Sequence, residues 1–81
     1  MTIEEFKRLV ETGREIEFSY RNKRYSITYG FIDDEYVISF CEFYKESTEV
    51  KDFDDLLNVS RDGIAVKEMI ESLRDKDIDV F

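Results

Sequence analysis

Residues 15–29 read EIEFSYRNKRYSITY, and apolar and polar side chains alternate on both sides of a short polar segment. Strict alternation over residues 15–20, and again over residues 24–29, is typical of β-strands that bury one face. Arg21-Asn22-Lys23 separates the two runs and predicts the turn of an antiparallel hairpin. The side chains that would share its inner face are Ile16, Phe18, Tyr20, Tyr25, Ile27 and Tyr29. The hairpin therefore predicts an antiparallel sheet with one face to be covered by helices.

The sequence after this hairpin predicts further strands. Gly30 indicates a bend or bulge at the end of the second strand, and Asp33-Asp34 indicates another turn. Residues 36–43 (YVISFCEF) are apolar on both faces for part of their length, which favours the central strand of the sheet. We expect residues 44–51 to cross irregularly from the sheet to the helices, and residues 77–81 to add a short edge strand.

Three helices are expected around these strands. Thr2 and Glu5 form a capping-box pattern ahead of the first helix, and Gly13 is a natural stop after it. Asp52 is a suitable N-cap for a short second helix, and the third helix is expected between Ile64 and Arg74. The order is α-β-β-β-α-α with a possible final β. It predicts a single α+β domain over residues 1–81, with helices packed on one face of a three- to four-stranded antiparallel sheet.

Charge is distributed unevenly along the chain. The net charge of the 81 residues is −8; residues 33–81 contain 15 acidic and 6 basic side chains, whereas residues 1–32 contain 5 and 6. A surface of one sign attracts surfaces of the other sign, so the expected partner is a basic protein surface. For the same reason, direct binding to nucleic acid or to anionic membranes is not expected.

The side chains that carry out most enzymatic chemistry are absent or isolated. The chain has no histidine, and its single cysteine, Cys41, is expected to be a buried structural thiol. Its three glycines are isolated, so they do not form a phosphate-binding loop. The acidic run Asp52–Asp55 resembles the start of a calcium loop, but Leu57 and Gly63 occupy the positions where an EF-hand needs glycine and glutamate. We therefore expect a protein that is not an enzyme and has no cofactor or metal.

Composition also predicts where the protein is found. A single cysteine fits a reducing compartment. No apolar run approaches the length of a membrane span, and residues 1–10 lack the pattern of a signal peptide. These features predict a cytoplasmic protein.

Two features that could indicate nucleic-acid contact have a simpler interpretation. The basic segment Arg21–Arg24 is more consistent with a solvated hairpin tip, since four residues on an acidic chain form a weak footprint. Four tyrosines of the predicted sheet could form a stacking platform for bases if its inner face were open. They are Tyr20, Tyr25, Tyr29 and Tyr36. A chain this short needs their area for its core, so we expect them to be buried.

Acidic side chains form three groups that we take as candidate partner-binding residues. They are Asp33, Asp34 and Glu35 at a turn, Glu42, Glu46 and Glu49 along the crossing segment, and Asp75, Asp77 and Asp79 near the C-terminus. The last three recur at every second residue, which would place them along one side of an extended segment. Such rows imitate the regular charge of a nucleic-acid backbone. The alternative is that these are scattered, solvated charges.

The chain as a whole resembles small acidic proteins of phages and mobile elements of Gram-positive bacteria, in particular type II-A anti-CRISPR proteins. The resemblance lies in residues 2–7 (TIEEFK), the hairpin over residues 16–29 and the acid-rich residues 52–79. It implies a non-catalytic inhibitor that binds an RNA-guided DNA nuclease and blocks the basic surface that holds nucleic acid. The alternative is a small regulatory interaction module without a nuclease target. Such a module would be a monomer, or a homodimer formed through an exposed edge strand.

Overall fold

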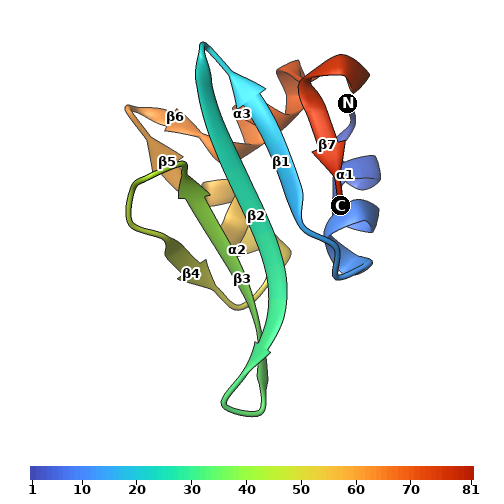
Figure 1. Cartoon of the computed structure of the whole chain (residues 1–81), viewed down its shortest axis with the longest axis vertical. Helices are drawn as coiled ribbons and strands as arrows, with labels where there is room; N and C mark the ends of the chain where they lie inside the picture. The colour runs from blue at the N-terminus through green and yellow to red at the C-terminus, as the bar shows by residue number, and fades with distance from the viewer.

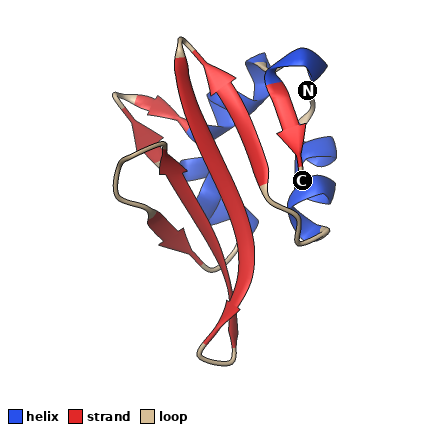
Figure 2. Ribbon diagram, in the orientation of Figure 1, coloured by secondary structure: helices blue, strands red, loops and turns tan.

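The computed structural model describes residues 1–81, and its main layer is a five-stranded antiparallel sheet in the order β4-β3-β2-β1-β7 (Figures 1 and 2). The strands are β1 (Ile16–Tyr20), β2 (Lys23–Ile32), β3 (Glu35–Glu42), β4 (Thr48–Val50) and β7 (Ile78–Val80). A separate two-stranded hairpin consists of β5 (Ser60–Arg61) and β6 (Ile64–Ala65). The α+β class, the antiparallel sheet and the C-terminal edge strand agree with the sequence-based prediction.

The helices lie behind the sheet in the view of Figure 1 and form the second layer. They are α1 (Ile3–Glu11), α2 (Phe53–Asn58) and α3 (Val66–Ser72), whereas the short 3₁₀-helix η1 (Asp75–Asp77) leads directly into β7 and has no buried residue. The predicted caps are confirmed: the amide of Glu5 donates to Thr2 Oγ1 at 3.1 Å, and the amide of Asp55 donates to Asp52 Oδ1 at 2.7 Å. Because each bond satisfies an amide that has no partner within its helix, the sequence fixes where α1 and α2 begin.

The core lies between the inner face of the sheet and the helices. Its 14 buried side chains are Phe6, Val10, Ile16, Phe18, Tyr25, Ile27, Ile38, Phe40, Phe53, Leu56, Val66, Met69, Ile70 and Leu73. Aromatic rings connect neighbouring strands: Phe18 and Tyr25 stack at 5.4 Å, and Tyr25 and Phe40 at 5.5 Å between ring centroids. These contacts join β1, β2 and β3 on the inner face of the sheet, which is the face that the alternating pattern predicts to be buried.

The first hairpin has a tighter turn than predicted. Only Arg21 and Asn22 form it, with φ of 49° and 65°, and Lys23 already pairs with Tyr20. Two consecutive residues with positive φ match the right-handed twist of the flanking strands, which is why two-residue turns of this kind dominate hairpins.

Other details of the sheet also differ from the prediction. Gly30 does not end the second strand, because it pairs with Val37 and β2 continues to Ile32. The central strand is β2 and not the 36–43 run, because β4 and β7 add one strand at each edge. Residues 44–51 are therefore not irregular throughout. The third helix begins at Val66, since Ile64 belongs to β6.

Candidate partner-binding surface

The β2–β3 hairpin extends beyond the rest of the sheet. The short strand β1 pairs with β2 only as far as Ile27, and β4 pairs with β3 only as far as Ile38. The end of the ladder, which joins residues 30–32 to residues 35–37, reaches past its neighbours and past the helices, at the bottom of Figure 1. We call residues 29–37 the overhang. Its tip lies at one end of a molecule that is 35 Å long.

The overhang exposes large apolar side chains. Phe31 is 60% exposed, Tyr36 59% and Ile32 48%. The ring of Tyr36 stacks on Tyr29 with a centroid distance of 5.2 Å and meets the edge of Phe31 at 5.0 Å. The alternation of a strand places these three rings on the helix side of the sheet and Ile32 on the opposite side. The overhang therefore has apolar side chains on both faces, and those near its tip are exposed because no helix reaches that far.

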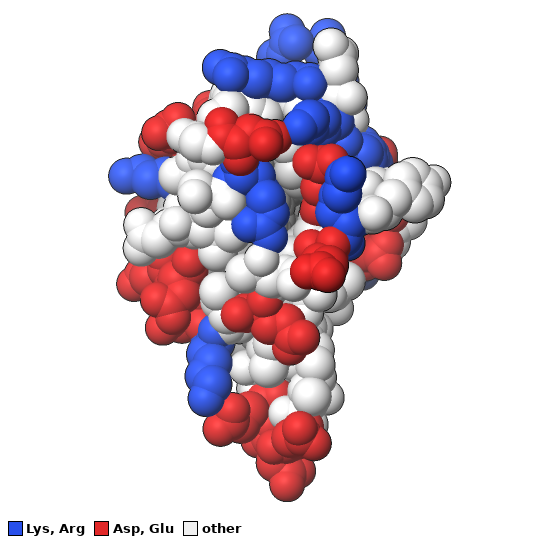
Figure 3. Space-filling model, turned by 90° about the vertical axis from the view of Figure 1, so that its left-hand side faces the viewer, with Lys and Arg blue, Asp and Glu red and all other residues white.

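The turn of the overhang is acidic. Asp33 and Asp34 form it with φ of 51° and 66°, a conformation that Asp tolerates better than most residues, and Glu35 follows at the start of β3. We call these three residues the acidic tip. Its one ion pair joins Glu35 to Lys51 at 3.1 Å, and the two aspartates have none. Figure 3 shows the carboxylates gathered at this end of the molecule.

A groove of about 700 Å³ lies beneath the overhang, between the C-terminal end of α1 and the start of α2. Its apolar lining consists of Val10, Tyr29, Tyr36, Ile38 and Phe53. Its charged lining consists of Lys7, Glu11, Lys51, Asp52 and Asp54. The groove adjoins the exposed rings, so the overhang and the groove form one continuous surface.

The three predicted groups of acids do not form one surface. Glu42 faces a polar hollow that also contains Lys23, Lys45 and Arg61, and its carboxylate lies 3.7 Å from Lys23 Nζ. Glu46 lines the same hollow. Glu49 is exposed on β4, opposite Ser39 on β3. Within this second group only Glu42 has an ion pair.

The prediction that Asp75, Asp77 and Asp79 line an extended segment is wrong. The first two belong to the 3₁₀-helix η1, and only Asp79 lies in β7. Asp77 Oδ2 accepts a hydrogen bond from the amide of Arg74 at 3.0 Å, and this bond caps η1. Asp79 Oδ2 lies 2.5 Å from Arg24 Nη2. Two of the three carboxylates therefore hold the C-terminal segment in place.

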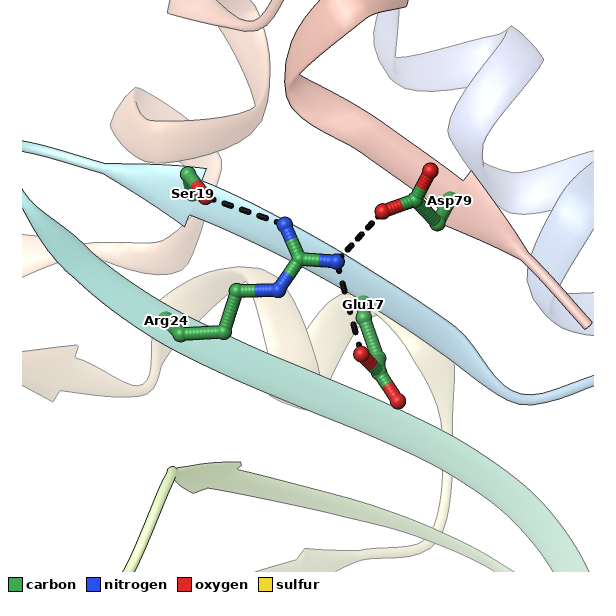
Figure 4. A network of polar contacts seen from close by, with 4 residues as sticks. All are labelled: Glu17, Ser19, Arg24 and Asp79. Atoms are coloured by element: carbon green, nitrogen blue, oxygen red, sulfur yellow. Dashed lines mark hydrogen bonds and ion pairs between the residues drawn. The ribbon is translucent and has the colours of Figure 1, made fainter.

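Arg24 is the centre of this C-terminal attachment (Figure 4). Its Nη2 contacts Asp79 on β7 and, at 3.4 Å, Glu17 on β1, while Nη1 donates to Ser19 Oγ at 2.9 Å. The hydrogen bond to Asp79 is the largest cause of a raised Arg24 pKa. One guanidinium thus ties three strands together on the side of the sheet that faces away from the helices.

The opposite end of β2 carries the basic residues, and two of its three cations, Lys23 and Arg24, have ion pairs. Lys23 Nζ lies 2.6 Å from Asp62, and this bond raises the pKa of Lys23 and lowers that of Asp62. The guanidinium of Arg21 lies over the ring of Tyr20 at 5.3 Å. We call residues 21–24 the basic tip. Of its three cations, only Arg21 has no ion pair.

The predictions that the four tyrosines and Cys41 are buried are only partly correct. Tyr36 is exposed although Tyr25 is buried, and Tyr20 and Tyr29 are half-buried. Cys41 is half-buried on the outer side of β3, where its Sγ lies 3.1 Å from Ser26 Oγ. The two errors have different causes: Tyr36 faces the helix side of the sheet but lies beyond the helices, whereas Cys41 faces the side that has no helical layer.

Sequence reasoning missed the exposed apolar part of this surface. Phe31 and Ile32 immediately precede the Asp33-Asp34 turn, and Tyr36 follows it. Apolar residues on both sides of a turn are a signal that the strands run on after their neighbours end.

The molecule offers no cluster of metal ligands and no membrane-spanning helix. No group of three or more His, Cys, Asp or Glu side chains is arranged to hold a metal ion. None of the helices combines the length and the hydropathy needed to cross a membrane. No protein-family model, curated protein or solved structure matches the chain.

Proposed function

We propose that this protein is a non-catalytic inhibitor that docks on a basic surface of another protein through the overhang. The observation that supports this is the combination of exposed aromatic rings with uncompensated carboxylates at one projecting end. Aromatic side chains supply most of the energy in the centres of protein interfaces, and charges around them set orientation and association rate. Phe31, Ile32 and Tyr36 would be the apolar anchors, and the acidic tip would pair with Lys and Arg of the partner.

The partner class that we propose is an RNA-guided DNA nuclease of the type II-A CRISPR system, which the resemblance of the chain implies. Such nucleases hold nucleic acid with Lys and Arg that contact backbone phosphates. Carboxylates of the acidic tip would form charge-assisted hydrogen bonds with the same groups. Inhibition would then require only occupancy, and it would take place in the bacterial cytoplasm. In this proposal the mimicry of nucleic acid is concentrated at the acidic tip, because its carboxylates lie beside exposed apolar anchors. Glu42, Asp77 and Asp79 already have partners within the chain.

A cleavage assay tests this proposal. Guide-loaded nuclease is incubated with increasing amounts of the protein before target DNA is added. We expect cleavage to stop near a one-to-one ratio, and the apparent affinity to fall as salt is raised. Full cleavage at a tenfold excess of the protein, at low salt, would rule out the nuclease as partner.

The second candidate function is a regulatory module that pairs with a copy of itself through β7. The exposed side chains of Val80 and Phe81 beside this edge strand favour it. An edge of three residues is short for stable pairing. Light scattering over a wide concentration range distinguishes the two, because a self-pairing module doubles its mass without any nuclease.

A further inference from the structure

The groove beneath the overhang has an aromatic wall. The rings of Tyr29 and Tyr36 line it as a pair tilted by only 20°. The side chains of Val10, Ile38 and Phe53 form the rest of its apolar surface. Flat aromatic surfaces of this kind favour planar groups, and cations bind to their faces more strongly than to aliphatic side chains.

The charged rim of the groove is acidic in balance. Carboxylates outnumber lysines three to two in its lining. One of the lysines, Lys51, is held by Glu35 of the acidic tip at 3.1 Å. Asp52 accepts the hydrogen bond that begins α2, whereas Glu11 and Asp54 have no ion pair. Two carboxylates on opposite sides of the groove are therefore free to meet a cation. Lys7, also without an ion pair, is the one group that opposes it.

We propose that this groove receives an arginine side chain of the partner protein. A guanidinium is planar, stacks on aromatic faces and donates several hydrogen bonds in one plane, so the tyrosine pair and the two carboxylates match it. Lysine matches less well, because its ammonium is a strongly hydrated point charge without a flat face. The inference deepens the proposed function and rests on it only for the identity of the partner. It names the side chain that the partner would place beside the overhang.

A peptide titration tests the inference without the nuclease. The ¹⁵N-labelled protein is titrated with an acetylated and amidated Gly-Arg-Gly peptide, and separately with the matched Gly-Lys-Gly peptide. We expect the arginine peptide to shift the amides of Thr12, Gly13, Tyr29, Tyr36 and Asp54. We also expect it to bind at least about threefold more tightly than the lysine peptide, in line with the strength of cation–π contacts.

Two variants test separately how the aromatic wall and the charged rim contribute to peptide binding. Tyr36→Leu keeps an apolar side chain but removes the aromatic face, so the preference for arginine over lysine should disappear. Asp54→Asn removes one rim charge, so both peptides should bind more weakly. As a matched control, Asp33→Asn with Asp34→Gly removes two carboxylates outside the groove and should leave its shifts nearly unchanged.

Three results would overturn the inference: no shifts at the groove, equal binding of the two peptides, or shifts spread over all acidic surfaces. If the peptide titration is positive but the protein does not inhibit the nuclease, the proposed partner is wrong and the arginine-binding groove still stands. If the protein inhibits the nuclease but the peptide titration is negative, the proposed function still stands and the assignment of arginine to the groove is wrong.

Discussion

The two ends of β2 have the same backbone and opposite surroundings. Each ends in a two-residue turn with positive φ, formed by Arg21 and Asn22 at one end and by Asp33 and Asp34 at the other. At the basic tip, Lys23 and Arg24 meet carboxylates that come from Asp62 and Asp79, far along the sequence. At the acidic tip only Glu35 meets a cation. Charge counted along a sequence is therefore a poor guide to the charge that a partner meets.

The difference arises from which strands flank each end. Next to the basic tip, β1 and β7 bring Glu17 and Asp79 into contact with Arg24. Next to the acidic tip there is no flanking strand, so no strand brings a cation to Asp33 and Asp34 or covers the apolar side chains beside them. The same absence of neighbours leaves Phe31 and Tyr36 exposed. The basic tip contributes to the stability of the fold, and the acidic tip is available for binding.

The largest expected effect comes from the exposed rings. Phe31→Ala with Tyr36→Ala should weaken binding to the guide-loaded nuclease by about thirtyfold or more, as is usual for aromatic anchors. The free energy of unfolding should change by about 1 kcal/mol or less, because the pair contributes only a cross-strand contact. Surface plasmon resonance and urea unfolding measure the two quantities.

Tyr44→Ala is the matched control, since Tyr44 is fully exposed away from the overhang. Its affinity should equal that of the unmodified protein. If both variants bind equally well, the exposed rings are not anchors.

The second effect concerns the charges of the acidic tip. Asp33→Asn with Asp34→Gly removes two carboxylates and keeps residues that suit positive φ. Binding should weaken by roughly tenfold, mainly through slower association, and its salt dependence should become less steep. Rapid-mixing kinetics at two salt concentrations measures both changes.

The matched control at the basic tip is Arg21→Asn with Asn22→Gly. It should associate with the partner at the rate of the unmodified protein, or faster. Equal slowing by the two pairs of substitutions would mean that both tips contact the partner.

The third effect is on stability at the basic end. Arg24→Met keeps the aliphatic stem and removes the guanidinium that joins β1, β2 and β7. Because Asp79 is largely exposed, we expect a loss of only about 1 kcal/mol of unfolding free energy. Hydrogen exchange should accelerate first at the amides of residues 78–81. Unchanged exchange there would show that Arg24 does not hold β7.

The smallest effect is the pH dependence of the Lys23–Asp62 pair. Because Lys23 lowers the Asp62 pKa below its usual 3.8, this carboxylate stabilises the fold above that value. Its contribution is lost as the pH falls through the lowered pKa. Urea midpoints between pH 5 and pH 2 should therefore fall slightly less for Asp62→Asn than for the unmodified protein. If the urea midpoints of Asp62→Asn and of the unmodified protein fall equally between pH 5 and pH 2, the Lys23–Asp62 ion pair is screened by solvent.

Short-range patterns predicted much of this fold. The alternation over residues 15–29 indicated the first hairpin, because its two strands are adjacent in sequence. The caps at Thr2 and Asp52 indicated two helix starts, because each cap bonds an amide three residues away. The Asp33-Asp34 turn was predicted for the same reason.

Features that depend on distant segments could not be predicted. Whether Tyr36 is covered depends on where β1, β4 and the helices end, and no local pattern contains that information. Whether Asp79 is free depends on Arg24, 55 residues away in sequence. The sequence therefore indicated that Asp33, Asp34 and Glu35 lie together at a turn, but it did not indicate that exposed rings lie beside them.

The most direct measurement exchanges the two tips in a single chain. Arg21→Asp with Asn22→Asp, combined with Asp33→Arg and Asp34→Asn, keeps the composition, the net charge of −8 and turn residues already found at positive φ. This chain and the unmodified protein are titrated into the same nuclease cleavage assay. We predict that the unmodified protein inhibits cleavage and that the exchanged chain, folded to the same extent by circular dichroism, does not. Equal inhibition by both chains would contradict the assignment of binding to the acidic tip.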